Sequence, residues 1–159
     1  MQDERVKVSA LKVVHGLLEN CFAFKFETEN KKVVFSGDTI FFPPLIDFAK
    51  DADVLVHEVM LKRGIEVLAE RLKKVKPNLI EHLMISHTTA EDAAKIAKEA
   101  NVKHLVFNHY VPHIPEEFPI SEFSEAASKV WDGKITAVSY THLRAHETRH
   151  DLVCRLLLE

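Results

Sequence analysis

This sequence has few cysteines, no long apolar run and no large excess of one charge. The two cysteines, Cys21 and Cys154, give no disulfide framework, so a reducing compartment and a cytoplasmic location are expected. No apolar run approaches the roughly 20 residues that span a bilayer, and the first residues lack the apolar core of a signal peptide. A net charge of −3 lacks the basic balance of a general nucleic-acid binder, although it leaves room for a nuclease whose basic surface lies elsewhere.

What is present is the composition of a soluble single domain with many histidines. The chain has 159 residues, of which 47% are hydrophobic and 28% charged, values typical of a folded globular protein. Ten residues are histidine, the commonest metal ligand and the side chain best suited to proton transfer at neutral pH. Composition alone cannot show whether these histidines bind metal, transfer protons or have neither role. Their positions in the sequence are therefore the informative feature.

The apolar pattern changes along the chain from adjacent strands to alternating helices and strands. Three predicted strands form an antiparallel meander at residues 5–14, 20–28 and 32–36. The pattern then predicts, in order, helix 44–50, strand 53–57, helix 61–75, strand 83–86, helix 89–100, strand 103–108, helix 120–131 and strand 133–137. This alternation is typical of a largely parallel sheet, and the predicted fold class is α/β.

Residues able to bind metal or carry protons stand at the ends of five predicted strands. They are His15, Asp38, His57-Glu58, His87 and His109. A histidine at a single strand end is usually structural or solvent-facing. Five neighbouring strand ends, however, meet at one edge of a sheet, where α/β proteins place their sites. The sequence therefore predicts a shared metal or catalytic site at this edge.

The series of motifs resembles the metallo-β-lactamase fold, and within it the ribonuclease Z branch. The matching motifs are VVH (13–15), FSGDT (35–39), VHE (56–58), SHTTAEDAAKIA (86–97) and LVFNHYVP (105–112). The resemblance covers roughly residues 5–137. It implies an αββα sandwich, of which this chain is the C-terminal half.

The resemblance also implies a role for each of these side chains. His15 would ligate a first metal, Asp38 would bridge two metals and His109 would ligate the second. His87 and Glu58 match a catalytic histidine that is not a ligand and the acid that supports it. Two zinc ions are implied, since imidazole nitrogen and carboxylate oxygen suit zinc, although manganese or iron occupies similar sites.

One motif of that family, H-x-H-x-D-H, is absent from the sequence. It would supply four further ligands. We therefore expect a C-terminal fragment, in which residues 1–137 form a partial domain that lacks the N-terminal half.

The last 22 residues depart from the family in another way. Within Val138–Glu159, His142, His146 and His150 are spaced four residues apart and would share one helix face. A zinc-binding helix and a solvated amphipathic helix are two hypotheses for this segment. We favour a third, because the segment resembles the conceptual translation of a sequencing-library adapter, and we expect 138–159 to be a non-native tail.

For the intact parent protein, the resemblance implies zinc-dependent hydrolysis of a phosphodiester through a metal-bound hydroxide, with precursor tRNA as the expected substrate. A small-molecule hydrolase of the same fold, acting on phosphodiesters, sulfate esters or lactones, is the alternative within enzymes. The second alternative is that this chain by itself is a non-catalytic fragment, because half of the metal ligands are absent. The expected partner is thus a phosphodiester or small-molecule substrate. No membrane association is expected, and a homodimer is one possible assembly.

Overall fold

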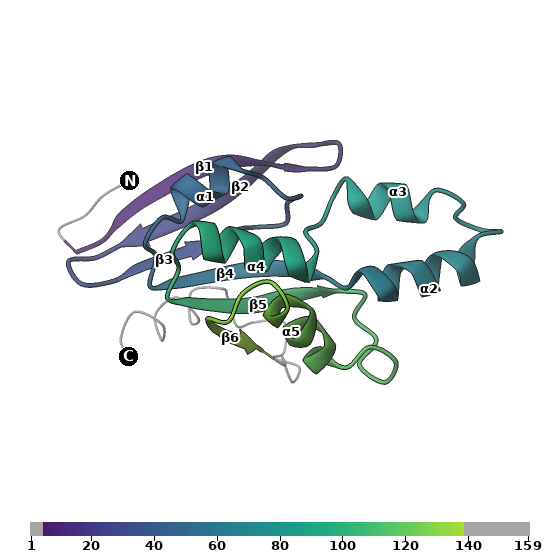
Figure 1. Ribbon diagram of the computed structural model, residues 1–159. Coiled ribbons are helices and arrows are strands. Elements are labelled where there is room, and N and C mark those ends of the chain that lie inside the picture. Colours follow the sequence, from purple (N-terminus) through teal and green to yellow (C-terminus); the bar gives the residue numbers. More distant parts are fainter. Residues whose placement is uncertain (1–4, 139–159) are drawn as a thin grey trace, which may run out of the picture.

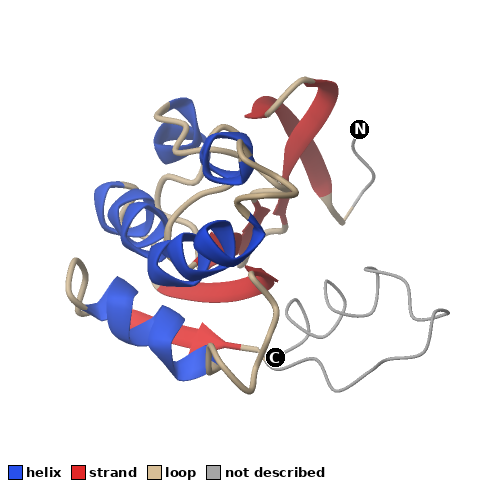
Figure 2. Ribbon diagram, turned by 90° about the vertical axis from the view of Figure 1, so that its right-hand side faces the viewer, coloured by secondary structure: helices blue, strands red, loops and turns tan. Residues whose placement is uncertain are grey.

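A computed structural model describes residues 5–138, which form a six-stranded sheet with helices packed against it (Figures 1 and 2). The strands are β1 (Lys7–His15), β2 (Leu18–Glu27), β3 (Lys32–Phe35), β4 (Val54–Met60), β5 (His104–Val111) and β6 (Lys134–Ala137). The helices are α1 (Pro44–Phe48), α2 (Lys62–Leu72), α3 (Leu79–Met84), α4 (Ala90–Glu99) and α5 (Ile120–Ser128).

The strands lie side by side in their order along the chain, from β1 to β6. Neighbours are antiparallel from β1 to β3 and parallel from β3 to β6. Parallel strands need crossover connections, and α1, the α2–α4 segment and α5 provide them. The predicted α/β fold, with a meander followed by a parallel region, is confirmed.

The core lies between the parallel strands and the helices α4 and α5. Leu55 and Val59 of β4 and Phe107 of β5 are fully buried there, and each large apolar side chain contributes about 1.5–3 kcal/mol through burial. They face α4, whose buried side consists mostly of alanines such as Ala93 and Ala97. Small side chains let α4 lie close to the sheet, and this fixes the loop that precedes it.

The predicted strand at 83–86 is wrong, because this stretch belongs to α3 and the turn after it. A short apolar run is typical of either element, and pairing decides between them. Here β4 pairs directly with β5 in the sheet, which leaves no position for a strand between them. His87 therefore follows a helix rather than a strand.

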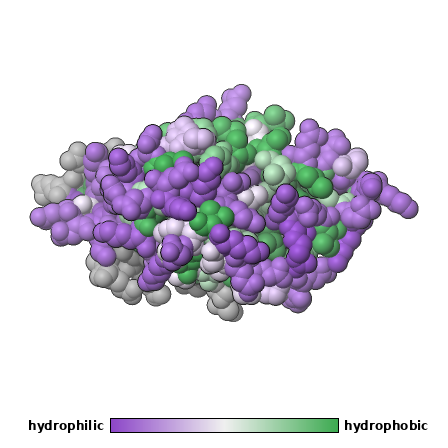
Figure 3. Space-filling view, in the orientation of Figure 1, coloured by the Kyte–Doolittle hydropathy of each residue, from purple (hydrophilic) through white to green (hydrophobic). Residues whose placement is uncertain are grey.

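Helices α2 and α3 extend beyond the end of the sheet (Figure 1). Arg63 of α2 makes two-pronged hydrogen bonds of 2.7 and 2.8 Å to Glu122 of α5. No residue of α3 is buried, and hydrophobic surface is visible around α3 and the β1–β2 turn in Figure 3. Within residues 5–138, no helix is long and apolar enough to cross a membrane.

Val138 follows β6, and its backbone N–H donates to the carbonyl of Phe107 on β5 at 3.3 Å. The predicted non-native tail otherwise lies outside the described residues, as do His142, His146 and His150.

Candidate active site

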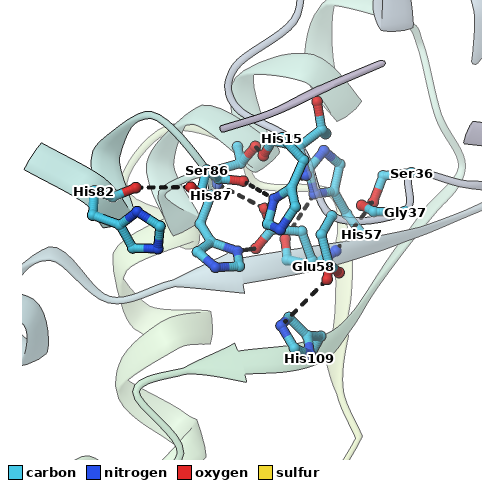
Figure 4. Close-up of polar contacts among 12 residues, drawn as sticks. His15, Ser36, Gly37, His57, Glu58, His82, Ser86, His87 and His109 are labelled. Atoms are coloured by element: carbon cyan, nitrogen blue, oxygen red, sulfur yellow. Dashed lines mark hydrogen bonds and ion pairs between the residues drawn. The ribbon is translucent and has the colours of Figure 1, made fainter. Parts of the chain in front are cut away.

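Three histidine side chains that are distant in sequence, those of His15, His87 and His109, lie together at one edge of the sheet (Figure 4), and Asp38 contacts His109. The ring of His87 lies near two others, with centroid distances of 5.0 Å to His15 and 5.6 Å to His109. Oδ2 of Asp38 lies 3.6 Å from Nε2 of His109. The structure thus brings the three residues predicted as metal ligands and the predicted catalytic histidine into one cluster.

Asp38 owes its place to a sharp turn after β3. Gly37 has a φ of 62°, a left-handed conformation that other residues rarely adopt. A Cβ at this position would lie 2.7 Å from the carbonyl oxygen of Phe22 on β2. Only glycine fits both demands, so the turn that carries Asp38 out of the sheet requires Gly37.

His109 lies within β5, not after it as predicted, and occupies an irregularity in that strand. Its neighbours Asn108 and Tyr110 pair with consecutive residues of β4, which leaves His109 as the extra residue of a bulge. Its φ of 45° is uncommon for a residue with a side chain, and strained backbone of this kind gathers at functional sites. The bulge turns the ring toward Asp38.

Glu58 and His87 form an ion pair at the buried side of the cluster. Oε2 of Glu58 lies 3.3 Å from Nδ1 of His87, and the two side chains are only 1% and 10% exposed. Neither atom has a well-aligned hydrogen bond to any other residue among those described. Burial lowers the pKa of His87, but the Glu58 carboxylate, with a further contribution from Asp38, outweighs it, so the pKa is raised from the usual 6.5.

Backbone N–H groups from two loops hold the other oxygen of Glu58. Oε1 accepts from the N–H of Thr39 at 3.2 Å and from that of Thr88 at 2.8 Å. The Thr88 hydroxyl donates to the carbonyl of Thr39, and the Glu58 N–H donates to Ser36 Oγ at 3.2 Å. The sequence analysis gave no role to Ser36, Thr39 or Thr88, although all three lie within the motifs FSGDT and SHTTAEDAAKIA.

His57 is fully buried beside Glu58 on β4. Its Nδ1 lies 2.7 Å from the carbonyl oxygen of Glu58. Burial lowers the pKa of His57, which keeps the ring neutral.

The donors present fit zinc in kind and in part of their arrangement. Nδ1 of His15 lies 2.6 Å from the carbonyl oxygen of Ser86, the usual second contact of a metal-binding histidine, and this leaves Nε2 as the ligand atom. Two ligand atoms on one tetrahedral zinc lie roughly 3.3–3.6 Å apart, and the 3.6 Å between Asp38 and His109 agrees. Among residues 5–138, however, no three His, Cys, Asp or Glu side chains are spaced to hold a metal by themselves.

Comparisons with known sequences agree with this geometry. The sequence profile of the beta-lactamase superfamily domain matches residues 1–110. The chain is 39% identical over 87 residues to a ribonuclease Z of Brevibacillus brevis, which covers 55% of this chain and 23% of that protein. It is 31% identical over 113 residues to a ribonuclease Z of Archaeoglobus fulgidus, with coverage of 71% and 32%. A zinc phosphodiesterase ELAC protein 2 homolog of Caenorhabditis elegans is 33% identical over 116 residues, 69% of this chain and 12% of that protein. The chain therefore spans between 12% and 32% of the length of these relatives.

Solved structures show the same fold. The metallo-beta-lactamase fold protein YhfI of Bacillus subtilis superposes with a TM-score of 0.67 at 20% identity, over 87% of this chain and 49% of that protein. The short form of human tRNase Z superposes with a TM-score of 0.51 at 24% identity, over 69% and 38%. The predicted metallo-β-lactamase fold and the resemblance to ribonuclease Z are confirmed: the chain belongs to the beta-lactamase superfamily domain family.

Proposed function

We propose that this chain provides part of the active site of a zinc-dependent phosphodiesterase of ribonuclease Z type. The observation that carries the proposal is the presence of two separate histidine–carboxylate pairs side by side. One pair, Asp38 and His109, has the spacing of ligands on one metal. The other, Glu58 and His87, is more deeply buried and is suited to proton transfer.

Asp38, His109 and His15 would hold the metal, and further ligands would come from a polypeptide segment that carries the missing H-x-H-x-D-H motif. Zinc supplies Lewis acidity and lowers the pKa of a bound water when it occupies such a site. The carboxylate of Asp38 has two oxygens, so it is the residue able to bridge two ions.

His87 would deliver a proton to the leaving oxygen of the substrate from Nε2. Its Nδ1 faces Oε2 of Glu58, which fixes the ring and its tautomer. The raised pKa of His87 favours the protonated ring, the form that a general acid requires.

The proposed substrate is a phosphodiester, and precursor tRNA within that class, because the similar proteins are ribonuclease Z enzymes and a zinc phosphodiesterase. The second candidate is a small-molecule hydrolase of the same fold, favoured by the net charge of −3, which is unusual for a protein that binds RNA. Zinc rather than manganese or iron, a cytoplasmic location and a homodimer stay predictions.

A chimera tests the proposal. Residues 5–138 replace the aligned segment of the Archaeoglobus fulgidus ribonuclease Z, which then supplies the absent motif. We expect a folded, zinc-loaded chimera to cleave precursor tRNA and bis(p-nitrophenyl) phosphate, and Asp38→Asn to lose both activity and zinc. A folded chimera with full zinc content that cleaves neither compound would contradict the proposal, and cleavage of the small compound alone would favour the second candidate.

His87→Ala in the same chimera separates the roles within the cluster. General acids contribute roughly 10²–10⁴-fold to rate, so we expect a loss of that size with zinc content unchanged. A variant that loses zinc would show that His87 is a ligand.

A further inference from the structure

Thr88 has all of its polar groups committed to hydrogen bonds inside the protein. Its N–H donates to Oε1 of Glu58 at 2.8 Å, its hydroxyl donates to the carbonyl of Thr39, and its carbonyl accepts from the N–H of Met60 at 2.8 Å. Thr88 is 1% exposed, Glu58 1% and Thr39 0%. A buried residue with three such bonds has one possible position, because moving it would leave several polar groups unpaired.

These bonds connect three separate segments of the chain. Thr39 follows Asp38 in the loop after β3, Glu58 belongs to β4, and Thr88 follows His87 in the loop between α3 and α4. Oε1 of Glu58 accepts one backbone N–H hydrogen bond from each loop. The Thr88 hydroxyl connects the two loops directly through its hydrogen bond to the carbonyl of Thr39. The residues adjacent to Asp38 and to His87 are thus fixed relative to each other.

We propose that Thr88 is a positioning residue that sets the place of Asp38 relative to His87 through its hydroxyl. The assignment of Asp38 as a metal ligand rests on the proposed function, whereas the connection between the two loops does not. Asp38 itself is 36% exposed, so its position depends on the backbone that carries it. The buried hydroxyl bond at the next residue, Thr39, supplies that support.

Removal of the hydroxyl without a change of volume is the sharpest test. Thr88→Val leaves the buried carbonyl of Thr39 without its donor, whereas Thr88→Ser keeps a hydroxyl. Thr136→Val is the matched control, because the Thr136 hydroxyl contacts Nε2 of His104 at 2.8 Å on β5 and β6, away from the two loops.

The first measurement is amide hydrogen exchange of the full chain, followed by NMR. We expect Thr88→Val to speed exchange at the N–H of Thr39 by about 10-fold, which corresponds to a loss of about 1.4 kcal/mol. We expect Thr88→Ser to restore protection and Thr136→Val to leave it unchanged. Unchanged protection of Thr39 in Thr88→Val, or a failure of serine to restore it, would overturn the proposal.

The second measurement is a titration of the full chain with Zn²⁺ alone, read from the resonances of Asp38 and His109. Residues that hold metal ligands in place typically contribute 10–100-fold to metal affinity, so we expect Thr88→Val to raise the half-saturating Zn²⁺ concentration at least about 10-fold. Thr88→Ser and Thr136→Val should stay close to the unsubstituted chain. Equal affinity in Thr88→Val would overturn the proposal even if exchange had changed.

The two measurements also separate this proposal from the proposed function. If Zn²⁺ shifts neither Asp38 nor His109 in the unsubstituted chain, the metal assignment fails. The exchange measurement alone then decides whether Thr88 connects the two loops.

Discussion

At the scale of single residues, the two side chains of the Asp38–His109 pair are placed by unusual backbone. Asp38 follows a left-handed glycine, and His109 is itself left-handed at a bulge in β5. Glycine adopts this conformation readily, whereas for His109 it costs free energy and persists because the neighbouring strands impose it. The backbone, more than side-chain packing, therefore brings these half-exposed residues together.

Gly37→Ala should destabilise the chain strongly for so small a change. The substitution combines an unfavourable left-handed φ, costing about 1–2 kcal/mol, with a contact of 2.7 Å to the Phe22 carbonyl. We expect a loss of about 2–3 kcal/mol in unfolding free energy by urea denaturation. Ser128→Ala, an exposed change at the end of α5, is the control. A loss below about 0.5 kcal/mol, the usual size for surface changes, would show that the turn adapts.

His87 should make stability depend on pH in a defined direction. Its pKa is raised in the folded protein from the usual 6.5, so its contribution is complete below pH 6.5 and is lost as the pH rises through the folded value. His57 acts oppositely, because its lowered pKa makes folding less favourable as the pH falls below 6.5. We therefore expect the stability difference between the unsubstituted chain and His87→Asn to shrink from about pH 6 to about pH 9. A difference that grows over this range would contradict the raised pKa.

At the scale of elements, α4 fixes the position of the loop that carries His87 and Thr88. Threonine is a favoured N-cap residue, and Thr89 caps this helix, since its Oγ1 accepts from the N–H of Asp92 at 3.1 Å. The alanine-rich inner face then packs against β4. Local sequence determines this helix because its cap, spacing and small residues all favour the same structure.

Thr89→Ala removes this cap and should cost about 1 kcal/mol of unfolding free energy, within the usual range of about 0.5–2 kcal/mol for N-caps. Thermal and urea unfolding measure it. Thr89→Ser keeps the acceptor and should recover most of the loss. If alanine and serine behave alike, the hydroxyl does not contribute as a cap.

At the scale of the whole molecule, the cluster takes its residues from β1, β4 and β5 and from the loops after β3 and α3, yet it is an incomplete metal site. Histidine and carboxylate ligands are present, but no three lie close enough together among the described residues to hold an ion. Affinity for zinc depends on the number of ligands held in place. The described part of the chain accordingly supplies some of the metal ligands and not a complete coordination shell.

The full chain should therefore bind zinc only weakly. We expect calorimetry to give a dissociation constant above about 1 μM, equivalent to less than about 8 kcal/mol of binding free energy, with no second tight site. Asp38→Asn should weaken it further. Tight binding of two zinc ions by the chain alone would show that its own residues complete the site.

The sequence by itself determined the fold class, the antiparallel meander, helix α4 and the identity of the clustered residues. These features depend on local apolar spacing, on the cap at Thr89 and on motifs at strand ends, all of which can be read along the chain. The motifs shared with ribonuclease Z contain His15, Asp38, Glu58, His87 and His109.

Only the tertiary structure decided the rest. Residues 83–86 are apolar enough for a strand, but β4 and β5 pair directly with each other. No place in the sheet remains for a strand between them, and the segment forms the end of α3 and the turn after it. The bulge at His109 depends on the register of two strands, and the bonds of Thr39 and Thr88 to Glu58 join residues that are 19 and 30 positions apart. Such contacts carry no local signal, because they exist only once the sheet has brought distant backbone groups together.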